Sequence, residues 1–200
     1  MTITKERFES GLTYEAYKAA MTRNRERLEE NERNVVLDPE ILAFFRSLPR
    51  PINVVVLAED WCGDVIANLP VLGKLANEAR TLNVRIFYRD QNPDLIERWL
   101  NQGKYQSIPV FAFFDDRMGE LAHWIERPAT VTELRAQKRR AIYEAHPEFG
   151  APDAPVADLP EDVRARLQDE LQKMREETAP FANREVQREL RDLVSLLPVR

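Results

Sequence analysis

The chain has 200 residues, of which 44% are hydrophobic and 32% charged, with a formal net charge of −5. This composition is typical of one well-cored globular domain with helical surface. The acidic balance argues against nucleic acid and membrane as partners, because both select basic patches. No apolar run approaches the roughly 18–20 residues that span a bilayer, and MTITKERFES lacks the apolar core of a signal peptide. With a single cysteine, we expect a cytoplasmic protein without disulfides.

Residues 1–49 predict a helical extension that packs on a core. Apolar residues at helical spacing over 12–33 indicate one amphipathic helix. The run Asp38-Pro39-Glu40 then supplies an N-cap, a first-turn proline and a first-turn acid. A second helix is therefore expected to begin there and to end near Pro49.

Residues 50–146 predict an α/β core. The run INVVVLA over 52–58 is almost continuously apolar and β-branched, which is typical of a strand buried on both faces. The order of elements that follows indicates a parallel crossover unit, then a hairpin and a covering helix. The expected elements are a helix over 63–80, a strand over 83–89, a helix from Asn92-Pro93 to Leu100, strands over 109–114 and 120–125, and a helix from a capping box at Thr130 and Glu133 to about Tyr143.

Beyond the core, residues 147–160 carry four prolines and one glycine and are predicted to be a linker. Residues 161–200 are then expected to form a C-terminal helical arm, which Pro180 breaks into two helices. Both helices carry an apolar stripe. These stripes could pack on the chain's own core or on a second copy, so the sequence leaves a homodimer open.

The stretch WCGDV over 61–65 directly follows the first predicted strand and contains Cys62. Three further features follow it in order. Pro70 lies eight residues after Cys62, a run Asp-Gln-Asn-Pro over 90–93 follows the second strand, and Ile108-Pro109 precedes the third. In these features, over roughly residues 50–143, the chain resembles the thioredoxin superfamily, and within it bacterial thioredoxin-like proteins with a WCGD motif and helical extensions.

This resemblance implies a three-layer α/β/α fold with a central mixed sheet, and it implies roles for several residues. Cys62 would be the nucleophile, and Pro70 would be a structural proline in the active-site helix. The bond before Pro109 would be cis and would face the sulfur, which leaves the backbone of Ile108 free to pair with an extended partner. The residues implied to contact a substrate are Trp61, Gly63, Asp64, Ile108 and Pro109.

The sequence also departs from the family. Val65 stands where the resolving cysteine would be, so an internal dithiol cycle is excluded. Many thioredoxins have a buried aspartate and a lysine that assist the second cysteine. The matching positions here are Val56 and Ile86, so the resolving thiol and its proton-handling pair are absent together.

Opposing local effects act on the Cys62 thiol. A sulfur at a helix start meets free N–H groups and the positive end of the helix dipole, which favour thiolate. The carboxylates of Glu59, Asp60 and Asp64 disfavour it, and no lysine or arginine lies within four residues. We therefore expect a modestly activated thiol.

Several alternatives remain for Cys62 beside a reactive single thiol. It could be an inert buried cysteine or, with His123 or His146, half of a cysteine–histidine hydrolase pair. The two histidines and Cys62 show no metal-ligand spacing, so no metal site is expected. A peroxiredoxin would have threonine or serine at Glu59, and a cluster-binding monothiol glutaredoxin would have Cys-Gly-Phe-Ser instead of Cys-Gly-Asp-Val.

Two functions from different classes fit these residues. In the first, Cys62 forms a mixed disulfide with a protein or small-thiol disulfide. An external thiol, such as glutathione or another low-molecular-weight thiol, then resolves it, in a role in cell redox homeostasis without a bound cofactor. In the second, the chain is a redox-inactive binding module that uses the cis-proline groove and the helical arms to hold a partner.

Overall fold

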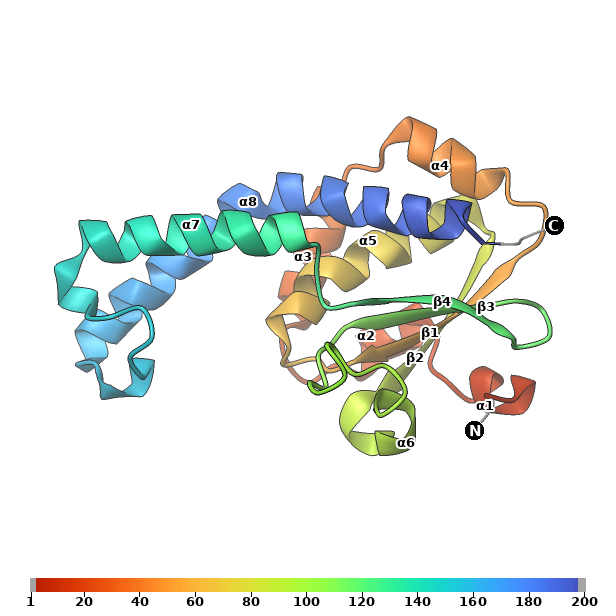
Figure 1. Ribbon diagram of the computed structural model, residues 1–200, viewed down its shortest axis with the longest axis horizontal. Coiled ribbons are helices and arrows are strands. Elements are labelled where there is room, and N and C mark those ends of the chain that lie inside the picture. The colour runs from red at the N-terminus through yellow and green to blue at the C-terminus, as the bar shows by residue number, and fades with distance from the viewer. Residues whose placement is uncertain (1–2, 198–200) are drawn as a thin grey trace. The chain divides into compact units, whose positions relative to one another are not determined.

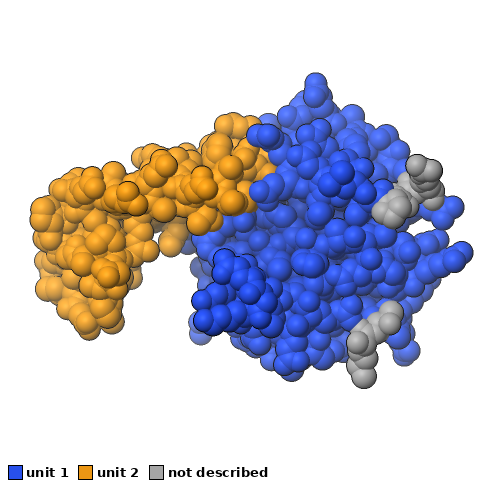
Figure 2. Space-filling model, viewed as in Figure 1, with its two compact units in different colours: residues 1–127, 186–200 blue, residues 128–185 orange. Residues whose placement is uncertain are grey.

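The computed structural model describes residues 3–197 and divides the chain into two compact units (Figure 2). One unit comprises residues 1–127 and 186–200, and the other comprises residues 128–185. The outer ends of the two predicted extensions, residues 1–2 and 198–200, lie outside the described residues. The boundaries predicted from composition, at residues 50, 147 and 161, separate segments of different sequence character and not compact units. They therefore stay a prediction.

The first unit is built on a four-stranded mixed sheet with the strand order β2-β1-β3-β4. Parallel pairing joins β1 to β2, while β3 pairs antiparallel with β1 and with β4. The predicted crossover and the predicted hairpin are therefore both confirmed. The strands are β1 (Ile52–Ala58), β2 (Leu82–Tyr88), β3 (Val110–Phe114) and β4 (Glu120–Ile125).

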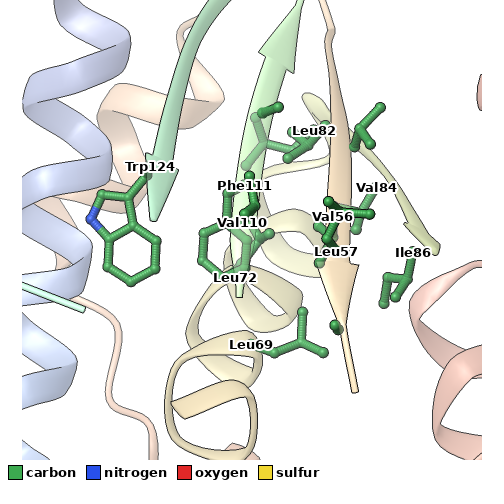
Figure 3. Packing of buried hydrophobic residues seen from close by; sticks show 14 of the residues in the cluster. Val56, Leu57, Leu69, Leu72, Leu82, Val84, Ile86, Val110, Phe111 and Trp124 are labelled. Atoms are coloured by element: carbon green, nitrogen blue, oxygen red, sulfur yellow. The ribbon is translucent and has the colours of Figure 1, made fainter. Parts of the chain in front are cut away.

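Helices cover both faces of this sheet, which explains why β1 reads as an apolar run. Helix α5 (Gly63–Ala79) and the last turns of α8 (Glu161–Ser195) lie on one face, while α1 (Lys5–Glu9) and α6 (Pro93–Ile96) lie on the other (Figure 1). Leu69 and Leu72 of α5 lie beside the strands, among the labelled apolar side chains of the sheet (Figure 3). The buried set includes Val56, Leu69, Leu72, Phe111 and Trp124.

The helix that covers the sheet after β4 is not the predicted one. The expected covering helix over about 130–143 corresponds to α7 (Ala129–Ala145), which belongs to the second unit. The last turns of α8 cover the sheet instead, because Val186, Leu190 and Val194 are buried in the main core.

Polar contacts fix this last part of α8 to the first unit. The fully buried side chain of Gln187 donates to Val36 O at 3.0 Å and accepts from Asp38 N at 2.8 Å. Trp124 Nε1 donates to Glu189 Oε2 at 2.6 Å. The end of α8 is therefore an integral part of the sheet's covering layer.

Pro180 does not break α8, so the predicted division of the arm into two helices is wrong. A proline inside a helix removes one backbone hydrogen bond and costs about 3 kcal/mol. Buried side chains on both sides of it, including Met174, Thr178 and Val186, oppose a break. Thr178 Oγ1 also donates to Met174 O at 2.8 Å in the turn before the proline.

The second unit pairs α7 with the first part of α8 through short 3-10 turns, Pro147–Phe149 and Val156–Asp158. Its core is a small cluster of Tyr143, Phe149 and Leu167. The predicted capping box is wrong. Helix α7 begins at Ala129 without a side-chain cap, and Thr130 Oγ1 donates to Glu185 Oε2 at 2.9 Å instead.

The N-terminal segment forms separate helices instead of the single predicted helix over 12–33. Thr13 caps α2 (Tyr14–Ala20), the chain is extended at Met21, and α3 (Arg25–Asn34) begins after Asn24, whose φ is 55°. The predicted helix after Asp38 is confirmed as α4 (Pro39–Arg46), with Asp38 as its N-cap. Helix α6 is shorter than expected and ends at Ile96.

The packing of α8 predicts a stability difference between two leucines near the C-terminus. Leu190 is fully buried, whereas Leu196 is 84% exposed. We expect Leu190→Ala to lower the free energy of unfolding of the first unit by about 2–5 kcal/mol, and Leu196→Ala to change it by about 0.5 kcal/mol or less. Urea unfolding followed by tryptophan fluorescence measures this, since all three tryptophans belong to that unit. Equal effects of the two substitutions would contradict the assignment of α8 to the core.

Candidate functional site

Cys62 lies at the corner between β1 and α5. It is the N-cap residue of α5, with an extended backbone (φ −83°, ψ 120°), and its carbonyl accepts from Ile66 N at 3.0 Å. Its own N–H donates to Glu59 O at 3.2 Å. The side chain is a free thiol of intermediate exposure. The sulfur therefore stands at the start of a helix, as expected.

The loop before β3 faces this sulfur. The peptide bond between Ile108 and Pro109 is cis, and Cys62 Sγ donates to Ile108 O at a distance of 3.6 Å. Ile108 and Pro109 are both buried. Within residues 3–197, the N–H of Ile108 has no hydrogen-bond partner. The arrangement implied by the resemblance, a cis proline opposite the cysteine, is present.

The remaining predicted residues surround this corner. Gly63 is exposed at the first position of α5, and Asp64 follows it in the first turn. Pro70 is buried within α5, which continues through it. Trp61 is 45% exposed beside the cysteine. The solvent-facing part of the corner is thus formed mainly by the WCGD stretch itself.

The positions that would support a second thiol are apolar and closed. Val65 is fully buried in the first turn of α5. Val56 and Ile86 are register partners on β1 and β2, and both are buried. The two residues are therefore neighbours, and together they leave no proton-handling group at that place in the sheet.

Burial dominates the ionisation of Cys62. Desolvation raises the pKa of its thiol above the ordinary 9.0, the nearby N–H groups of Val65 and Asp64 oppose this, the Asp64 carboxylate raises it further, and Arg89 lowers it. The net direction is upward. The expectation of a modestly activated thiol is therefore wrong, because the sequence does not reveal how far the sulfur is buried.

Two of the neighbouring acids hold the loop. Asp60 Oδ2 accepts from Thr22 N at 2.8 Å and Arg23 N at 3.0 Å, and Glu59 Oε1 accepts from Asp90 N at 2.8 Å. Both carboxylates are buried. Their main contribution is to attach the loop before Cys62 to the N-terminal helices and to the end of β2.

An arginine that is distant in sequence lies near the thiol. Arg89 follows β2, and its guanidinium lies 5.1 Å from the centre of the Trp61 ring. It also donates to Gln106 O at 3.2 Å and to Asp90 Oδ1 at 2.6 Å. Arg89 is far from Cys62 in sequence, and the parallel pairing of β1 and β2 brings it to the corner.

A second network connects the cis-proline loop to α5. Glu126 has a φ of 67° and donates its backbone N–H to Pro109 O at 2.8 Å. Its backbone carbonyl accepts from Asn68 Nδ2 on α5, also at 2.8 Å. Its carboxylate accepts from Asn101 Nδ2 at 2.8 Å. Arg127 bonds the same carboxylate and lies 3.3 Å from Asp64 Oδ2. Glu126 and Arg127 were not singled out from the sequence, since nothing local marks them.

Other kinds of site receive no support from the described part of the chain. Residues 3–197 contain no group of three or more His, Cys, Asp or Glu side chains placed to hold a metal ion. The same residues contain no helix long and apolar enough to cross a membrane.

A family model described as thioredoxin matches residues 11–139, which is more than half of the chain. The chain belongs to the thioredoxin family. The match begins near α2 and ends within α7, so it includes the Cys62 corner and the cis-proline loop. A comparison with curated proteins finds no match.

Solved structures show the same fold as this thioredoxin-family chain. A crystal structure of an HIV epitope scaffold has a TM-score of 0.64 at 15% identity, covering 96% of this chain and 98% of that one. A protein of unknown function from Pseudomonas aeruginosa has a TM-score of 0.60 at 17% identity, covering 84% of this chain and 95% of that one. At these identities the similarity establishes the fold alone. It confirms the α/β thioredoxin-like class with its mixed sheet and helical extensions.

The burial of Cys62 predicts slow alkylation at neutral pH. Since the pKa of the thiol is raised, only a small thiolate fraction is present there, and the fraction grows as the pH rises through the folded pKa above 9.0. The measurement is the rate of iodoacetamide alkylation against pH in the folded and the urea-unfolded chain. A folded-state midpoint below that of the unfolded chain would contradict this account.

The Glu126 network predicts a pH-dependent contribution to stability. Burial opposes its ionisation, but hydrogen bonds from Arg127, Ser107 and Asn101 lower its pKa below the ordinary 4.5. A lowered folded pKa stabilises the fold above 4.5, and this stabilisation is lost as the pH falls through the folded pKa. We expect Glu126→Gln to cost about 1–3 kcal/mol at neutral pH and less in acid. Unfolding free energies test this, with exposed Glu97→Gln as the control; a pH-independent difference would contradict it.

Proposed function

We propose that the protein carries out thiol–disulfide exchange through the single sulfur of Cys62. The observation that carries the proposal is the geometry of the corner: Cys62 Sγ stands at the start of α5, 3.6 Å from the carbonyl oxygen of Ile108, before the cis Pro109. Val65 replaces the second sulfur, so the proposal is limited to a one-thiol mechanism.

The proposed cycle has two balanced steps. The Cys62 thiolate attacks one sulfur of a disulfide R–S–S–R′, which forms the mixed disulfide Cys62–S–S–R and releases R′–S⁻, which takes up a proton from water. An external thiolate then attacks the R sulfur, forms a disulfide with R, and releases the Cys62 thiolate. Glutathione or another low-molecular-weight thiol is the proposed external reductant, and the protein itself is unchanged after both steps.

The backbone of Ile108 supports a substrate that contains a peptide-like segment. Its N–H has no partner within residues 3–197, and an extended chain could accept from it as an added strand does. The exposed ring of Trp61 and the open position at Gly63, whose missing side chain has nothing within 4 Å, leave room on the outer side. Asp64 and Pro109 are the other proposed contacts.

A second candidate is a redox-inactive binding module that uses the same loop to hold a partner. The observation that favours it is the burial of the Cys62 sulfur, which raises its pKa and disfavours the nucleophilic thiolate. In that case the Ile108 backbone would still pair with an extended partner, and Cys62 would be idle.

Exchange with oxidised glutathione separates the two candidates. The reduced protein is incubated with oxidised glutathione and its mass is measured, with Cys62→Ser as the control. A glutathione adduct on wild-type protein that reduced glutathione later removes supports the exchange function. If the folded chain forms no adduct but the unfolded chain forms one readily, the exchange function is contradicted. The binding module is then the remaining candidate.

A second thiol at position 65 is predicted to restore an internal disulfide. Residue 65 lies in the first turn of α5, at the spacing from Cys62 that the family uses, and the site is closed to solvent. We expect Val65→Cys to form an intramolecular disulfide on mild oxidation, detected as a mass lower by two hydrogens and resistance to alkylation. Val65→Ser is the matched control. Two thiols that stay alkylatable after oxidation would show that the corner does not have dithiol geometry.

A further inference from the structure

Arg127 joins the first turn of α5 to the strand end that supports the cis-proline loop. It follows β4, and its guanidinium lies 3.3 Å from Asp64 Oδ2 and also bonds the Glu126 carboxylate. Glu126 in turn donates its backbone N–H to Pro109 O at 2.8 Å. The side chains of Arg127 and Asp64 are both largely shielded from solvent. This ion pair therefore spans the corner in which Cys62 lies.

Asp64 stands where a carboxylate competes with the sulfur for the start of α5. It lies in the first turn, and Cys62 is the N-cap, so by helix geometry their α-carbons are about 5–6 Å apart. The N–H groups of a first turn have no partner inside the helix, and they attract negative charge. The Cys62 side chain makes no cap hydrogen bond to them. A released Asp64 carboxylate would therefore turn toward the same N–H groups that a Cys62 thiolate needs.

The other charged groups around this turn are held in other ways. The loop acids Glu59 and Asp60 accept from backbone N–H groups, at the end of β2 and just after α2 respectively. Arg89, after β2, donates to a carbonyl of the loop before β3 at 3.2 Å. Asp64 differs from the two loop acids because it pairs with a side chain, that of Arg127. The place of its carboxylate thus depends on an ion pair that one substitution removes.

We propose that Arg127 is a positioning residue for Cys62. By holding the Asp64 carboxylate, it keeps that charge away from the start of α5 and leaves the N–H groups there to the sulfur. This matters when Cys62 is a thiolate, which is when it attacks a disulfide and again when it leaves the mixed disulfide. Arg127 acts through Asp64 and takes no part in the bonds that form and break. The inference rests on the proposed exchange function and adds to it a residue from outside the WCGD stretch.

The test measures the rate of iodoacetamide alkylation of Cys62 against pH in a set of variants. Arg127→Gln should raise the pKa of Cys62 by about half a unit, which lowers the rate at neutral pH about threefold. Asp64→Ala removes the carboxylate that Arg127 holds, so adding Arg127→Gln to Asp64→Ala should change the profile little. The comparison isolates the effect that passes through Asp64, because the bond to Glu126 is lost in both backgrounds.

Arg98→Gln is the matched control. Arg98 lies 3.1 Å from Glu120 Oε2, in an ion pair of similar exposure to that of Arg127 and Asp64. Glu120 begins β4 and pairs with the last residue of β3, whereas the cis proline precedes the first residue of β3. Removing this ion pair should therefore leave the alkylation profile of Cys62 unchanged, whatever it does to stability.

Two results would overturn the inference: an unchanged profile in Arg127→Gln, or the same shift with and without the Asp64 carboxylate. Urea unfolding shows that each variant is folded under the alkylation conditions. Arg127→Lys is a second variant that keeps a cation beside Asp64, so its profile should lie closer to wild type; a shift equal to that of Arg127→Gln would also contradict the inference. If wild-type protein forms no glutathione adduct while Arg127→Gln still shifts the profile, the exchange function fails and the role of Arg127 in Cys62 ionisation stands.

Discussion

The anchoring of the first turn of α5 is the constraint on which the rest of the site depends. The helix is buried against the sheet, with Leu69 and Leu72 in the core. The loop before α5 is attached to the N-terminal helices through Asp60, and the second turn of α5 is joined to the cis-proline loop through Asn68 and Glu126. These contacts fix Cys62 opposite Ile108. The N-terminal helices and the end of α8 complete the core that keeps this corner in place.

Patterns that involve only neighbours in the chain were predictable from sequence. The buried strand at 52–58, the Asp38 cap and the Ile108-Pro109 motif each express a local requirement, and the structure contains all three. Features decided by tertiary contacts were not. The predicted capping box is absent because Thr130 bonds Glu185 instead, and α8 continues through Pro180. Arg89 reaches the corner only through strand pairing, so no spacing in the sequence indicates it.

The ionisation of Cys62 likewise depends partly on local sequence and partly on tertiary packing. The sequence correctly indicates a helix start, whose N–H groups favour thiolate, but it cannot show that the sulfur is partly buried and that burial has the larger effect. A thiol with a raised pKa is a weak nucleophile toward small reagents. In the proposed exchange, selectivity toward disulfides would come from contacts that only a docked substrate makes, and the unpaired N–H of Ile108 is the group best placed to provide one.

The most direct test of this account is therefore a comparison of two reagents. Rate constants for Cys62 with iodoacetamide and with oxidised glutathione are measured in the folded and the urea-unfolded chain at one pH. Iodoacetamide has little that could pair with the Ile108 backbone, whereas glutathione has peptide groups. The account predicts that folding slows the reaction with iodoacetamide and accelerates the reaction with oxidised glutathione. If folding slows both reactions by the same factor, Cys62 is a buried and idle cysteine, and the exchange function is contradicted.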